Sequence, residues 1–550
     1  KSLISVEEVS AIRGELRYRL LESIREFAAE RLHERVQRHE ENLGQLHQRL
    51  AKYLIGEIER LRERSALTLA KDTQARIQIE SANLLAALQA VKDHFPELGA
   101  RLVLVSSSMI RTPETGLLLF NAIKSVLAHE DKLEPLTTVR VCAVSLEIAL
   151  QGFSVKLEES FAERGLEAAK RLAAINPASP NAKRALAYAY EAKAVLAMQL
   201  SNNKDAVEFA KLAEEAFDDL PEDRNFARIL RTRAYACMNL GENDDAEVYF
   251  DRSEAMNRRL GDDEALMATL SRAVGLRMNR GEVQRAAAIC DEIEEIARRR
   301  NLTAGVAEAT FNRAGILYAQ QEYHRAIEEF HKAEKLYREN GQERNALVAM
   351  GNRAVVYSNV GEDERALKDH VEALRLWRAR GDRMMVTSRL VGIGQTLGNL
   401  KRYQEEWKFL EEAETIAREL GVKPALAAAL GFKATNVIYC DEHCAKPAMR
   451  ASARKAALEA VEIYRALNAT KQRMCFDALA ALAWLDFLES KQPGHDEAEQ
   501  ARLLESARNY AEEAAKVGEA AKVARYEKVS QGKEVEVLMW RWIDEIRQSS

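Results

Sequence analysis

The stretch NRAGILYAQQEYHRAIEEFHKAEKLY, from Asn312 to Tyr337, is followed forty residues later by NRAVVYSNVGEDERALKDHVEALRLW, from Asn352 to Trp377. Both contain two helix-length segments joined by a short turn. Small residues recur at matching places: Ala314 and Ala354 in the first segment, and Ala326, Ala333, Ala366 and Ala373 in the second. Small residues on one face let two helices pack closely. The two stretches therefore predict a helix pair that repeats along the chain.

Glycine marks the ends of the predicted helices. One series recurs every forty residues and contains Gly241, Gly281 and Gly361, with Gln321 and Lys401 at the remaining places. A second series runs half a period later and contains Gly261, Gly341, Gly381 and Gly421, with Asn301 in the fifth place. Glycine, or asparagine in its place, suits a left-handed turn at the end of a helix. Two helix ends per period predict two helices of roughly fifteen residues each, the pattern of an α-solenoid.

The composition favours helix and limits the kinds of partner. The chain has 550 residues, of which 47% are hydrophobic and 30% are charged, and it has only nine prolines. Its net charge of −5 comes from well-mixed acids and bases, so we expect no direct nucleic-acid binding. No apolar run approaches the ~18–20 residues of a membrane span, so no membrane contact is expected. The six scattered cysteines and the lack of a signal peptide favour a cytoplasmic location.

The quoted stretches resemble tetratricopeptide (TPR) repeats, because Ala314 is followed by Tyr323 in the turn and then by Ala326, Phe330 and Ala333. The resemblance implies an all-α fold, a right-handed TPR-like α-solenoid (superhelix) with longer helices than usual. Clear repeats are expected from about residue 225 to 424. A further repeat is expected over 183–220, and degenerate pairs are expected over 424–470 and 473–520.

The N-terminal segment has a different pattern. Two β-like runs, Ser2–Val6 and Glu15–Leu21, precede an amphipathic helix that begins at Ser23. The KSL run at Lys1–Leu3 and the YRLLE run from Tyr18 resemble the last hairpin and exit helix of the winged-helix module in STAND-class proteins, the signal-transduction ATPases with numerous domains. The segment IESANLLAALQAV, Ile79–Val91, resembles the helix that precedes the sensor array in these proteins.

This resemblance implies four parts. They are the end of a winged-helix domain with a short β-hairpin (1–35), a helical linker bundle or degenerate repeats (36–182), the regular TPR-like repeats (183–424), and degenerate C-terminal repeats with a capping helix (425–550). It also implies an upstream NTPase module, and the chain starts at Lys1 in mid-pattern, so we expect a longer protein. No stretch matches a Gly-rich phosphate loop with its Lys and Ser/Thr. We therefore expect no enzyme activity and no cofactor in this chain, with ATP and Mg²⁺ confined to the upstream module.

Asparagine recurs at one position of the repeat, which holds Asn239, Asn279, Asn359 and Asn399, with Ala319 breaking the series. In TPR repeats this position faces the concave groove. A side-chain amide can bind both the C=O and the N–H of an extended peptide. Further candidates for the groove or its edge are Asn312, Asn352, Tyr235, Tyr318 and Gln395. The alternative is a capping role, since each asparagine of the series lies two residues before a helix end.

Arginine recurs at another repeat position, as Arg233, Arg313 and Arg353. This position points towards the partner helix, where a buried arginine requires an acid. We expect salt bridges to carboxylates such as Glu329 and Asp369, with an anionic ligand as the alternative.

Two C-terminal features have competing interpretations. The CDEHC motif contains Cys440, His443 and Cys444, but zinc requires four ligands and no second Cys/His pair has suitable spacing, so we expect core packing and no metal site. The final helix, from Glu536 to Arg547, carries Trp540 and Trp542. It is expected to cap the solenoid, and the alternative is an oligomer contact.

The favoured function is that of the ligand-sensing arm of a STAND-class signalling ATPase. A peptide or protein in the concave groove would regulate the upstream module, which would exchange nucleotide and homo-oligomerise on activation. One alternative is a plain TPR scaffold that joins partner proteins. The other is the small-molecule-sensing arm of a transcription regulator.

Overall fold

The computed structural model describes residues 4–8, 16–20, 22–38, 42–65, 80–106, 113–149, 155–217, 220–467, 473–521, 523, 526–528, 534–536 and 538–548. The chain forms two compact units. Unit 1 comprises Lys1–Met198 and Asn203–Ala346, and unit 2 comprises Gln199–Asn202 and Leu347–Ser550. Within the described ranges, no helix is long and apolar enough to cross a membrane. The boundaries predicted at residues 35, 182 and 424 stay predictions.

Unit 1 begins with two antiparallel strands, β1 (Ile4–Glu8) and β2 (Leu16–Leu20), and then α1 (Glu22–Gln37). The register pairs Ile4 with Leu20 and Glu8 with Leu16. The Lys1–Leu3 run and the end residues Glu15 and Leu21 of the second predicted strand lie outside the described residues. The origin of this segment in a winged-helix domain stays a prediction.

The next part of unit 1 is helical and contains α2 (Leu43–Ser65), α4 (Ser81–Val91), α5 (Pro96–Ser106), α6 (Pro113–Leu127), the 3-10 helix η2 (Glu130–Lys132), α7 (Pro135–Ala149) and α8 (Val155–Ile175). The helix predicted over Ile79–Val91 corresponds to α4, and Ile79 itself lies outside the described residues. Apolar side chains of α2, α4, α5 and α6 share one core, in which Ile58, Leu88 and Phe120 are buried.

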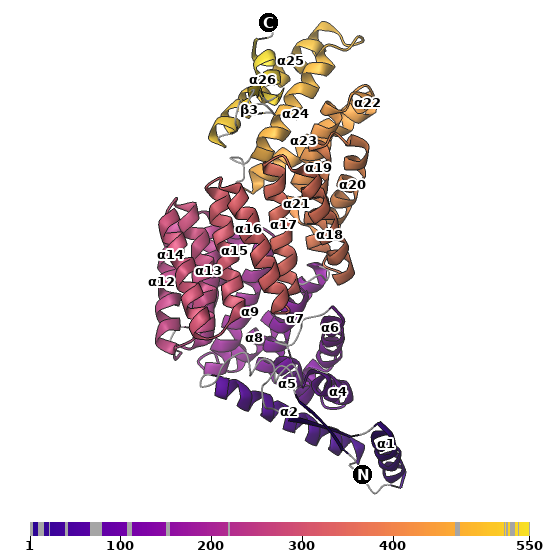
Figure 1. Cartoon of the computed structure of the whole chain (residues 1–550), viewed down its shortest axis with the longest axis vertical. Coiled ribbons are helices and arrows are strands. Elements are labelled where there is room, and N and C mark those ends of the chain that lie inside the picture. The colour runs from indigo at the N-terminus through magenta and orange to yellow at the C-terminus, as the bar shows by residue number, and fades with distance from the viewer. Residues whose placement is uncertain are drawn as a thin grey trace. The chain divides into compact units, whose positions relative to one another are not determined.

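The regular part of unit 1 consists of helix pairs: α9 (Pro180–Gln199, whose last residue belongs to unit 2) and α10 (Asn203–Phe217), α11 (Arg224–Leu240) and α12 (Asn243–Leu260), α13 (Asp263–Asn279) and α14 (Val283–Arg299), and α15 (Thr303–Ala319) and α16 (Tyr323–Glu339). From α10 to α16 each helix packs against the next, and α11, α13 and α15 also contact one another in sequence. Figure 1 shows α12 to α16 side by side. The alanines at the predicted close contacts, Ala246, Ala286 and Ala326, are fully buried. The predicted helical repeat is confirmed.

The helix-ending turns share one backbone geometry. Gly241, Gly281 and Gly361 have φ between 72° and 93°, and Asn301 has φ 53°. The two places without glycine adopt the same conformation, with φ 63° at Gln321 and 59° at Lys401. In each turn the left-handed residue and its successor donate backbone hydrogen bonds back into the last helical turn, as a Schellman motif requires. The repeat therefore sets the turn even where the side chain disfavours it.

The repeat pattern continues in unit 2. Helix α17 (Glu343–Asn359) crosses the unit boundary, and its residues from Leu347 onward belong to unit 2. Unit 2 also contains α18 (Asp363–Arg380), α19 (Arg383–Asn399), α20 (Tyr403–Leu420), α21 (Lys423–Tyr439), the one-turn α22 (Asp441–Cys444), α23 (Pro447–Ala466), α24 (Arg473–Ser490), α25 (Glu497–Ala520), β3 (Tyr526–Lys528), β4 (Glu534–Glu536) and α26 (Leu538–Gln548). The antiparallel pair β3–β4 was not predicted from the sequence. The degenerate helix pairs expected after residue 424 correspond to α21 with α23, and to α24 with α25.

The last helix, α26, packs on α24 and α25. Trp540 is 1% exposed and its ring lies 5.0 Å from that of Phe476, while Trp542 stacks on Trp484 at 4.8 Å. Both tryptophans are core residues of unit 2. This burial favours the capping interpretation, because neither indole is exposed to anchor a second copy.

Candidate functional site

The asparagine series lies at the ends of the first helices of the repeats. Asn239 is the second-to-last residue of α11, and Asn279, Asn359 and Asn399 are the last residues of α13, α17 and α19. The Schellman turn that follows each of them is closed by backbone groups two and three residues later in the chain. Side-chain capping by the asparagine is therefore not needed to end these helices.

All four asparagine side chains of the series are exposed. Asn239 and Asn279 belong to unit 1, and Asn359 and Asn399 belong to unit 2. The amide nitrogen of Asn399 donates to Asp363 at the start of α18, at 2.9 Å. An exposed amide at the same place of successive first helices can donate to and accept from a bound chain.

The other predicted groove residues differ in their surroundings. Tyr318 and Gln395 are exposed, and Asn352 is half-buried. The half-buried Tyr235 lies beneath the guanidinium of Arg272, which is 4.9 Å from the ring centroid. These four residues remain candidates for the groove.

Asn312 belongs to a polar chain between neighbouring helices. It donates to Ser271 Oγ at 2.9 Å, and Ser271 donates to Glu308 Oε1 at 2.6 Å. Tyr337 of α16 donates to the other oxygen of Glu308 at 2.8 Å. The chain joins α13, α15 and α16, which gives Asn312 a structural role that its position in the repeat did not reveal.

The predicted arginine salt bridges form, but not always with the expected acid. Arg353 donates from Nε to Asp369 at 2.7 Å, as predicted. Arg313 pairs instead with Glu294 at 2.9 Å and Asp291 at 3.0 Å, both on the preceding α14, and not with Glu329. Arg233 likewise pairs with Glu214 on the preceding α10. All three guanidinium groups already form ion pairs with carboxylates of the protein. These ion pairs weaken the alternative that the arginines bind an anionic ligand.

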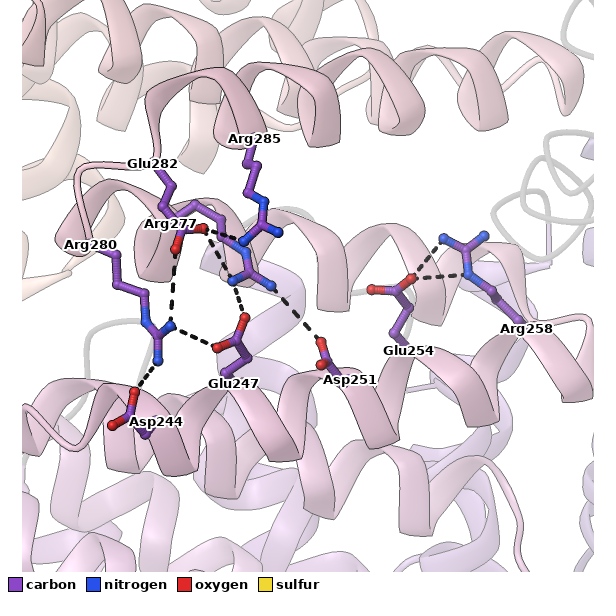
Figure 2. A network of polar contacts seen from close by, with 9 residues as sticks. All are labelled: Asp244, Glu247, Asp251, Glu254, Arg258, Arg277, Arg280, Glu282 and Arg285. Atoms are coloured by element: carbon purple, nitrogen blue, oxygen red, sulfur yellow. Dashed lines mark hydrogen bonds and ion pairs between the residues drawn. The ribbon is translucent and has the colours of Figure 1, made fainter.

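A larger charge network covers the turn between α13 and α14 (Figure 2). Arg277 and Arg280 reach from the end of α13 to Glu247 on α12, and Glu282 accepts from Arg277 at 3.4 Å and from Arg285 at 3.0 Å. The hydrogen bond from Arg277 is the main reason that the pKa of Glu247 lies below its usual value. Every acid in this network has a basic neighbour, so the network joins α12, α13 and α14 and offers no uncompensated charge.

The CDEHC motif contributes to a buried polar cluster. Nδ1 of His443 is 2.8 Å from the side-chain oxygen of Asn436, and the amide nitrogen of Asn436 donates to Glu406 at 2.7 Å. Burial raises the pKa of Glu406 to about 8. Gly398 leaves room for this carboxyl, since a Cβ there would lie 3.2 Å from it. Within the described part of the chain, no group of three or more His, Cys, Asp or Glu could hold a metal ion.

Arg389 on α19 is a buried arginine with two unpaired nitrogens, and it was not predicted from the sequence. A signal was present, because the equivalent places in the other repeats hold small or apolar residues: Ile229, Thr269, Ala309, Ala349 and Ala429.

Comparisons with known proteins give weak likenesses only. No family model matches the chain, and no curated protein matches it. A crystal structure of a Rap protein complexed with Competence and Sporulation Factor is similar at 14% identity and TM-score 0.44, covering 67% of this chain and 98% of that one. A tetratricopeptide repeat protein from Parabacteroides merdae is similar at 16% identity and TM-score 0.35, covering 50% of this chain and 94% of that one.

A STAND protein with a tetratricopeptide repeat sensor from Pyrococcus horikoshii is similar at 16% identity and TM-score 0.35. The match covers 76% of this chain and 56% of the length of that protein. These values are too low to assign a family or a function.

Proposed function

We propose that this chain is a repeat arm that binds a peptide or protein along the first helices of its repeats. The observation that supports this most directly is the exposed asparagine series at the end of α11, α13, α17 and α19. Backbone groups already close the helix ends, so these exposed side chains are not required as helix caps. An extended peptide carries unpaired N–H and C=O groups, and one amide side chain can satisfy both.

We further propose that the arm regulates an NTPase module in a longer STAND-class protein. This part rests on the sequence resemblance of the first ninety or so residues, with the KSL run at Lys1–Leu3 and the helix at Ile79–Val91. Ligand binding would favour one arrangement of the stacked helices over another, because the small angles between neighbouring repeats add up along an array. The right-handed superhelix and homo-oligomerisation on activation belong to the same proposal.

The test is affinity capture from host lysate, with identification of what is retained. The parent chain is compared with a variant in which Asn239, Asn279, Asn359 and Asn399 are all alanine. A matched control variant replaces four exposed side chains of the second helices by alanine: Gln284, Glu328, Lys368 and Lys408.

We expect one identified protein or peptide that the parent and the control retain and the asparagine variant loses. Equal capture by all three chains would refute the asparagine site. A partner that is lost only with the control variant would place binding on the second helices instead.

A further inference from the structure

Arg389 is the exception at a repeat position that is otherwise small or apolar. The equivalent side chains Ile229, Ala309, Ala349 and Ala429 are fully buried where neighbouring helices meet. An arginine there introduces a long charged side chain into a close contact. Arg389 remains buried all the same, with 9% of its surface exposed.

Gly351 on α17 makes room for this arginine. A Cβ on Gly351 would overlap with Nη1 of Arg389 and lie 2.7 Å from its Cζ, so no other residue fits there without displacing the guanidinium. The same place in neighbouring repeats holds larger side chains, Phe311 and Val391. Arg389 and Gly351 therefore form a matched pair that gives this one junction a buried cation.

The charge of Arg389 has no acidic partner among the described residues. Its Nε and Nη1 are buried and make no hydrogen bond, and Nη2 donates only to Ser388 Oγ, at 3.0 Å. Burial alone lowers the pKa of Arg389, to about 10, so the guanidinium is charged at neutral pH. A buried, unpaired charge is strongly unfavourable unless an opposite charge reaches it.

The histidine that lies near Arg389 adds no positive charge to this junction. His370 on α18 lies near Arg389, and burial, with a smaller contribution from Arg389, lowers the pKa of His370 to about 3. The imidazole is therefore neutral. A single guanidinium beside a neutral histidine matches a singly charged anion, and a planar carboxylate fits its parallel N–H groups.

We propose that Arg389, with Ser388 beside it, binds a carboxylate of the ligand. This inference rests on the proposed function, and it specifies that the bound peptide carries an acidic side chain or a free C-terminus at this junction. Ser388 is half-buried and directly precedes Arg389 in α19, so the carboxylate would enter past the serine hydroxyl. It would then accept hydrogen bonds from the guanidinium nitrogens that have no partner.

Small probes test the site without a known peptide. The unfolding midpoint of the full chain is measured at constant ionic strength with N-acetyl-glutamate amide, which carries a side-chain carboxylate, and with N-acetyl-alanine, which carries a terminal carboxylate. N-acetyl-glutamine amide is the neutral control, and inorganic phosphate is a competing anion. Each probe is also measured with Arg389→Met and with Arg375→Met, which removes an exposed arginine of α18.

We expect a saturable rise of the midpoint, by about 2 °C or more at 100 times the Kd, with one or both carboxylate probes. The neutral amide should have no effect, and the rise should persist in Arg375→Met and disappear in Arg389→Met. The probe that acts identifies the source of the carboxylate.

Two results would overturn the carboxylate site: the same rise in Arg389→Met, or a larger rise with phosphate than with either carboxylate. The variant lacking the four asparagines separates this site from the proposed function. If that variant keeps the carboxylate response while no peptide binds any chain, the peptide proposal fails and the Arg389 site stands.

Discussion

Arg353 and Arg389 are both buried in unit 2, at 8% and 9% exposure, and they differ in their neighbours. Arg353 donates to Asp369, whereas Arg389 meets no carboxylate among the described residues. The removal of a paired charge leaves its partner buried alone, whereas the removal of an unpaired one relieves a desolvation penalty. The two arginines should therefore respond to the same substitution in opposite directions.

We predict that Arg353→Met destabilises the chain by about 3 kcal/mol, because Asp369 loses its partner. Arg389→Met should stabilise it by about 1–3 kcal/mol, because methionine fills similar space without a charge. Urea unfolding followed by circular dichroism measures both variants in parallel. A lower midpoint for Arg389→Met than for the parent would show that Arg389 already has a partner in the unliganded chain.

The raised pKa of Glu406 predicts that the stability of the folded chain depends on pH. Its folded-state pKa of about 8 lies above the ordinary value of 4.5, so the folded state holds the proton more tightly. The stability that this provides is full below pH 4.5 and is lost as the pH rises through 8. Glu406→Gln keeps an oxygen for the amide of Asn436 and removes the titration.

We expect the stability of Glu406→Gln relative to the parent to increase between pH 5 and pH 9, as seen in their urea midpoints. His443 and all other titrating groups are common to both proteins, so their effects cancel to first order in the comparison. An equal difference at both pH values would show that Glu406 ionises normally in the folded chain.

At the scale of the helix, the turns offer a test of backbone strain. Gln321 and Gly281 occupy equivalent left-handed positions in unit 1, with φ 63° and 72°. The left-handed conformation is unfavourable for a residue with a Cβ and is accessible to glycine. Apart from its own residue and its two chain neighbours, a Cβ on Gly281 would have no described atom within 4 Å. A substitution there therefore changes the backbone conformation and leaves the packing unchanged.

Gln321→Gly should therefore raise the stability of the chain by about 1 kcal/mol, and Gly281→Gln should lower it by about the same amount. Chemical unfolding of the two variants beside the parent measures these changes. If both substitutions shift the midpoint in the same direction, the turn conformation does not determine their effect.

The helices themselves could be predicted because their signals are local. Glycine spacing gives the helix ends, and the buried alanines Ala246, Ala286 and Ala326 give the contact faces. The partners of long side chains could not be predicted in the same way. Arg353 pairs with Asp369 on the following helix, whereas Arg313 pairs with Glu294 on the preceding helix. The register between neighbouring helices decides which acid each arginine reaches.

A large side chain on one helix and the glycine that makes room for it on another helix also cannot be recognised as a pair from the sequence. Glu406 takes the place of a buried alanine because Gly398 opens space opposite it, and Arg389 fits because Gly351 does the same. Each pair breaks the repeat at two positions on different helices. A single sequence shows both departures, but only the packing connects them.

At the scale of the molecule, the repeats of each unit present equivalent side chains on neighbouring first helices, with Asn239 and Asn279 in unit 1 and Asn359 and Asn399 in unit 2. The asparagine series would supply contacts to the peptide backbone, which are independent of the peptide sequence. Arg389 would add a contact to one charged group and thereby fix the position of the ligand along the array. Affinity and selectivity would then come from different residues.

The most direct test of this account is the affinity of a captured or display-selected peptide for the parent chain and for the variant in which Asn239, Asn279, Asn359 and Asn399 are alanine. A net contribution of about 1 kcal/mol per hydrogen-bonded amide predicts that the Kd, measured by fluorescence anisotropy, rises by at least about 30-fold. An unchanged Kd in a variant with the helicity of the parent would contradict the central claim that these asparagines bind the ligand.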